Sequence, residues 1–63
     1  MSDVDLIGAG YEGTVRSLFS SFFTRLVEAG GNSDAVTHAE QAFKQGLSIA
    51  RDARDRASKI VGS

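Results

Sequence analysis

Apolar residues recur at alternating steps of three and four along the second half of the chain. We call them the small-residue seam: Val36, Ala39, Phe43, Gly46, Ala50, Ala53, Ala57 and Ile60. This spacing places them on one side of an α-helix, and the heptad period lets that side follow a partner helix through many turns. The pattern predicts one long helix over residues 34–61. Glycine inside a helix costs about 1 kcal/mol relative to alanine, so Gly46 indicates close approach of a backbone or a phenylalanine ring.

A second helical pattern covers residues 11–29, with apolar residues on an arc about 180° wide. We expect the centre of this stripe to face the seam; its members are Val15, Leu18, Phe19, Phe22 and Leu26. Phe23 and Val27 form a shoulder beside it. The extra width favours a second neighbour from outside the chain, and the alternative is a partly exposed Phe23.

Residues 30–33 are predicted to form the turn between the two helices. Gly30 suits the left-handed position that ends a helix, and Asn32, Ser33 or Asp34 can cap the next one. So short a connection makes the helices antiparallel neighbours. The expected fold is therefore an all-α antiparallel helical hairpin forming a single domain over residues 1–63.

Residues 1–10 are expected to form a short leader before the first helix. Ser2 and Asp5 have the spacing of a capping box, which allows one helical turn, and an extended segment is the alternative. A helix rises about 1.5 Å per residue, so the predicted second helix is longer than the first. Its last two to three turns should therefore extend beyond the end of the first helix. The leader or a partner chain would cover that overhang.

The stretch GAGYEG, residues 8–13, matches the G-x-G-x-x-G pattern of dinucleotide-binding turns. That pattern belongs to a strand–helix–strand unit within a parallel sheet, and this chain has room for only one candidate strand. We therefore expect a flexible joint and a permissive helix start instead of a nucleotide site.

The size of the chain indicates self-association. A chain of 63 residues has a marginal core, and it has no cysteine for disulfides or a thiolate zinc site. We expect a homodimer, formed as a four-helix bundle, that acts as a cytoplasmic, non-enzymatic protein-interaction module, such as a small regulator or adaptor. The predicted interface comprises Phe19, Phe22, Phe23, Val27, Phe43, Gly46, Ala50, Ala53, Ala57 and Ile60.

Charged residues near the C-terminus suggest an alternative class, an RNA- or DNA-binding hairpin dimer. Its contacts would come from a basic edge of Lys44, Arg51 and Arg54. Acids four residues before bases in RDARDRASK favour a solvated ion-pair face instead, and the net charge is −1.

His38 is the single histidine, without companions at ligand or catalytic spacing. We therefore expect no enzyme, no metal site and no cofactor, and no apolar run suits a membrane span.

Overall fold

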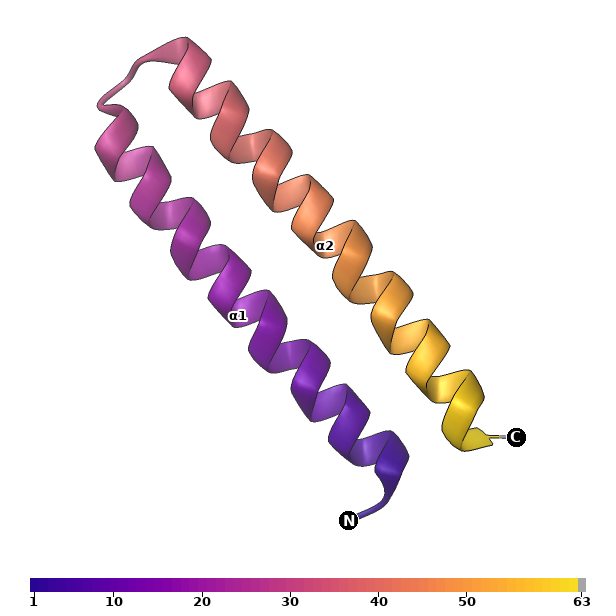
Figure 1. The fold of residues 1–63 in the computed structure, drawn as a ribbon. Coiled ribbons are helices and arrows are strands. Elements are labelled where there is room, and N and C mark those ends of the chain that lie inside the picture. Colours follow the sequence, from indigo (N-terminus) through magenta and orange to yellow (C-terminus); the bar gives the residue numbers. More distant parts are fainter. Residues whose placement is uncertain (63) are drawn as a thin grey trace.

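Two antiparallel α-helices make up the fold (Figure 1). The computed structural model describes residues 1–62. Helix α1 spans Asp3–Ala29 and helix α2 spans Ser33–Gly62. Both ends of the chain therefore lie at the same end of the hairpin, opposite the turn (Figure 1). The all-α helical hairpin is confirmed, and α2 begins and ends within one residue of the predicted boundaries.

The turn has the predicted glycine stop and a single capping side chain. Gly30 is left-handed, with φ 56° and ψ 32°, and its amide donates to the Val27 carbonyl at 3.3 Å. Gly31 also has a positive φ, 87°. Of the three candidate caps, Asn32 holds the position, because its Oδ1 accepts a hydrogen bond from the Ala35 amide at 2.9 Å. The helix ends are thus satisfied locally, which keeps the connection short.

The leader predicted over residues 1–10 is wrong as a separate segment. Ser2 and Asp5 form the capping box: the Asp5 amide donates to Ser2 Oγ at 3.2 Å, and the Ser2 amide donates to Asp5 Oδ2 at 3.4 Å. Helix α1 therefore begins at Asp3 instead of residue 11. The three glycines lower the helix propensity, but Ile7, Gly8 and Tyr11 are half-buried, and such tertiary packing stabilises a helix more than propensity does.

The glycines of residues 8–13 form neither a phosphate-binding turn nor a joint. Gly8, Gly10 and Gly13 all lie inside α1, and none has a positive φ. Phosphate binding by this motif requires a glycine turn that leads into a helix N-terminus, whereas here the N-terminus is five residues earlier, at Asp3. The expected flexible joint is therefore corrected to continuous helix.

The overhang of α2 predicted from a short first helix is also wrong. Helix α1 has 27 residues and α2 has 30, so the two run side by side over almost their whole length (Figure 1). Phe22 stacks on Phe43, and Arg54 lies over Tyr11 nearer the chain ends. The extended α1 thus runs beside the C-terminal part of the seam, where Ala57 is half-buried while Ala53 and Ile60 remain exposed.

The hairpin is a single layer of helices with almost no core. Its Cα atoms extend over 47 × 18 × 6 Å. Within residues 1–62 only Ala39, 2% exposed, and Ala50, 8% exposed, are buried. Two helices side by side can shield only the line along which they touch, so both broad faces of the layer remain open.

Candidate interaction site

The inner contact between the helices is closest at Gly46. A Cβ atom added to Gly46 would lie 2.5 Å from Cδ2 of Leu18 and 3.3 Å from its Cδ1. Real Cβ atoms do not approach other carbons so closely, so glycine is what admits the Leu18 side chain. The close approach predicted at Gly46 is present, although the group that approaches is a leucine side chain instead of a backbone or a phenylalanine ring.

Several residues of the predicted interface take part in packing within the hairpin. The Phe22 and Phe43 rings stack with centroids 4.8 Å apart and planes 13° from parallel. Both rings are partly buried, as are Gly46 and Ala57, while Ala50 is buried. These five residues lie between the two helices, and their contribution to a partner interface stays a prediction.

Other residues of the predicted interface form an exposed apolar stripe on α1. Phe19, Phe23 and Val27 are 58%, 59% and 65% exposed. They are spaced four residues apart and so share one side of the helix. Phe19 was expected at the centre of the covered stripe and is instead on the open shoulder. The α1 residues that face α2 include Tyr11, Leu18 and Phe22, which are half-buried. Phe19 lies to one side of them and is therefore exposed.

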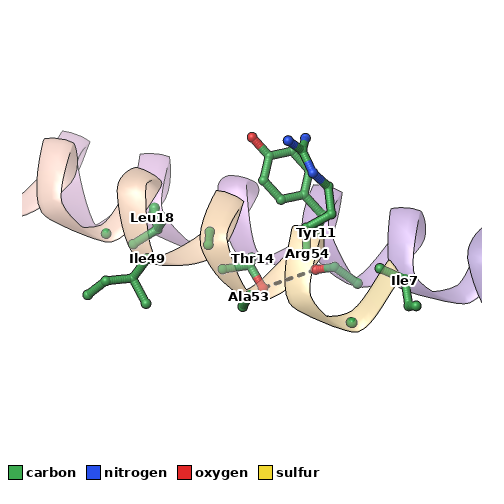
Figure 2. A pocket seen from close by; sticks show the side chains of 11 residues that line it. Ile7, Tyr11, Thr14, Leu18, Ile49, Ala53 and Arg54 are labelled. Atoms are coloured by element: carbon green, nitrogen blue, oxygen red, sulfur yellow. Dashed lines mark hydrogen bonds between the residues drawn. The ribbon is translucent and has the colours of Figure 1, made fainter. Parts of the chain in front are cut away.

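An apolar groove runs along the other side of the contact line, towards the chain ends (Figure 2). Its volume is about 510 Å³. The α1 part of its lining is Ile7, Gly10, Tyr11, Thr14 and Leu18, and the α2 part is Gly46, Ile49, Ala50, Ala53, Arg54 and Ala57. Most of the α2 lining consists of small residues, whereas α1 contributes the larger Ile7, Tyr11 and Leu18.

Tyr11 and Arg54 close one side of the groove. The Arg54 guanidinium carbon lies 4.5 Å from the centroid of the Tyr11 ring, within range of a cation–π interaction. Arg54 Nε also lies 3.3 Å from Asp55 Oδ1. Both side chains project from the side of the hairpin opposite Ile49 (Figure 2). The groove thus opens on the Ile49 side and is backed by the stacked pair on the other.

The predicted basic edge is only partly available for a nucleic acid. Arg54 is held by Tyr11 and Asp55, whereas Lys44 and Arg51 are exposed. Farther along α2, Arg56 Nε pairs with Asp52 Oδ2 at 2.8 Å, which confirms that acid-before-base pair. Exposed pairs of this kind contribute a few tenths of a kcal/mol, so they neutralise charge more than they stabilise the fold.

Other chemistry is sparse along the described chain. Within residues 1–62, no group of three or more acidic or histidine side chains comes together to hold a metal ion. His38 is exposed near the turn, where Arg25 and Glu28 share a shallow hollow with it. Neither α1 nor α2 carries an apolar stretch long enough to cross a membrane.

The groove combines residues that sequence patterns do not join. Ile49 lies outside the heptad spacing of the seam, and Ile7 and Gly10 fall in the region assigned to a leader. Only the register of the two helices brings them together.

Comparison with known proteins finds no match to the chain among protein-family models, curated proteins or solved structures.

Proposed function

We propose that this chain is a non-enzymatic interaction module that pairs with a second copy of itself, forming an antiparallel four-helix bundle. The observation that carries the proposal is the single-layer architecture with two buried residues within 1–62. A stable domain buries the apolar side of each element against a second layer. A second hairpin would supply that layer.

The exposed surface area of the chain indicates how large the proposed interface would be. The chain exposes 4797 Å², about 900 Å² more than the roughly 3,900 Å² expected for a compact monomer of its mass, 6.7 kDa. A standard protein interface covers about 800 Å² of each partner. The excess therefore equals what one ordinary interface would remove.

The shape supports the same conclusion. The radius of gyration is 14.7 Å, against roughly 11 Å for a compact domain of this length. Stacking two slabs face to face doubles the thickness without lengthening the particle. A paired hairpin would approach the proportions of a four-helix bundle, which is the arrangement that short-looped hairpins commonly complete.

Sedimentation equilibrium from micromolar to high micromolar concentration tests the proposal. We expect a mass of twice 6.7 kDa at the upper end, with helical circular dichroism throughout. A folded monomer over the whole range would refute self-association.

The basic edge supports nucleic-acid binding less well. Arg54 and Arg56 each have an acidic partner, so Lys44 and Arg51 carry what remains of the edge. Binding through phosphates weakens steeply with salt. A fluorescent random RNA that shows no salt-sensitive binding at low ionic strength would exclude this class of function.

A further inference from the structure

We infer that the second copy docks on the groove side of the hairpin, each copy inserting Ile49 into the groove of the other. The inference rests on the proposed self-association and adds which face pairs and which residue enters the groove. The hairpin has two broad faces, and the choice between them can be argued from contacts and charge.

The two faces carry different exposed side chains. Leu18 and Phe22 define the direction in which α1 faces α2. At about 100° per residue, Phe23 points about 120° to one side of that direction and Gly10 about 100° to the other. The aromatic stripe of Phe19 and Phe23 and the groove beside Gly10 therefore belong to opposite faces.

The groove face offers both a projection and a recess. Ile49 is 70% exposed and stands at the rim of the groove (Figure 2). The groove beside it is lined by small residues of α2, Gly46, Ala50 and Ala53, together with Gly10, Thr14 and Leu18 of α1. A branched apolar side chain next to a smooth recess is the complementary pair that a two-fold interface needs, because each copy presents both halves.

Charge favours the same face. Arg54 is the one charged residue that lines the groove, and its guanidinium lies over the Tyr11 ring on the side away from Ile49. On the opposite face, Glu12 and Arg16 line a shallow hollow beside Tyr11 and Val15. Covering those two charges would remove their hydration, whereas covering the groove itself removes mainly apolar surface from water. The groove side of α1 also carries Arg25 and Glu28, but these line a separate hollow near the turn.

The excess surface area of the chain indicates how many faces of the hairpin a second copy would need to cover. One interface of ordinary size accounts for the excess surface of the chain, so one of the two faces is enough. A second hairpin on the groove face would fill the unoccupied space between α1 and α2 and leave the aromatic stripe outside the pair.

Matched aspartate variants test the choice of face. Ile49 and Phe23 are both exposed apolar residues in mid-helix, 70% and 59%, so Ile49→Asp and Phe23→Asp make comparable changes on opposite faces. We expect Ile49→Asp to raise the dimer dissociation constant roughly 100-fold or more, because each of two symmetric contacts gains a buried charge. Phe23→Asp should change it by no more than about threefold.

A second measurement covers the case in which Ile49→Asp fails to fold. The chain has no cysteine, so Ile49→Cys and Phe23→Cys each introduce a single thiol. We expect alkylation of the thiol at position 49 to slow as protein concentration rises through the dissociation constant. The thiol at position 23 should react at the same rate at every concentration.

The possible results separate the two proposals. A wild-type dimer that Phe23→Asp dissociates and Ile49→Asp does not, or protection at position 23 alone, would overturn the choice of face and leave self-association standing. A wild-type monomer would overturn both. If such a monomer binds the dye ANS and Ile49→Asp abolishes that binding, the groove belongs to a small apolar ligand instead.

Discussion

At the scale of single residues, the helix contact depends on Gly46 and Leu18. The glycine removes a Cβ that would lie 2.5 Å from Leu18 Cδ2. Gly13 provides a natural comparison, since it also lies within a helix and an added Cβ there meets nothing within 4 Å. The two positions have a similar backbone cost and differ in their surroundings, so the effect of packing can be measured apart from helix propensity.

We expect Gly13→Ala to raise the free energy of unfolding by about 1 kcal/mol through helix propensity. Gly46→Ala makes the same gain but forces Leu18 to move, and overpacking typically costs about 1–3 kcal/mol. Gly46→Ala should therefore be at least about 1 kcal/mol less stable than Gly13→Ala, and Gly46→Leu less stable still. Denaturant unfolding at fixed protein concentration measures all three.

The control for this prediction is the Leu18→Ala background, which removes the side chain that the new Cβ would meet. In that background Gly46→Ala should become stabilising. Equal gains from Gly13→Ala and Gly46→Ala in the wild-type background would contradict the claim that glycine is required at this contact.

At the scale of elements, each helix begins at a capping side chain. Ser2 caps α1 and Asn32 caps α2. Asn32 also lies in the turn that sets the register between the helices, next to two glycines with positive φ. Loss of this cap would leave the Ala35 amide in the first turn of α2 without its side-chain acceptor.

We expect Asn32→Ala to lower the free energy of unfolding by about 1 kcal/mol, because the Ala35 amide loses its acceptor. Asn32→Asp keeps a capping oxygen and should stay within a few tenths of a kcal/mol of wild type. Thermal unfolding followed by circular dichroism compares the two. An equal loss in both variants would point to a role for the Asn32 amide nitrogen instead of its oxygen.

At the scale of the whole molecule, the hairpin has two open faces, and within residues 1–62 only Ala39 and Ala50 are buried. Its exposed area exceeds that of a compact protein of this mass by about the size of one interface. If folding and pairing are coupled, stability becomes a property of concentration as well as of sequence.

We therefore expect the thermal midpoint of the wild-type chain to rise with protein concentration, because association stabilises only the folded state. Scans across a hundredfold concentration range would measure the effect. In the variant Ile49→Asp, the midpoint should be lower and should no longer depend on concentration. A wild-type midpoint that stays constant across the range would mean that the hairpin is stable alone.

Local patterns were sufficient to predict most of the hairpin. The heptad spacing of the seam predicted α2 to within one residue at each end. Gly30, with Asn32, Ser33 or Asp34 as candidate caps, predicted the turn. These signals act within one or two helical turns, through backbone conformation and side-chain caps. For that reason they can be recognised without knowing what packs against the helix.

Only the tertiary structure decided how far α1 extends and which residues line the groove. Three glycines made residues 8–13 look like a joint, yet packing against α2 carries the helix through them. Phe19 lies outside the helix contact because the contact is closest where the Leu18 side chain packs against Gly46. Ile49 and Gly10 are distant in sequence and line the same groove only because of the register of the two helices. Sequence thus determined the elements, since their signals are local, and packing determined the surface, since it depends on both helices at once.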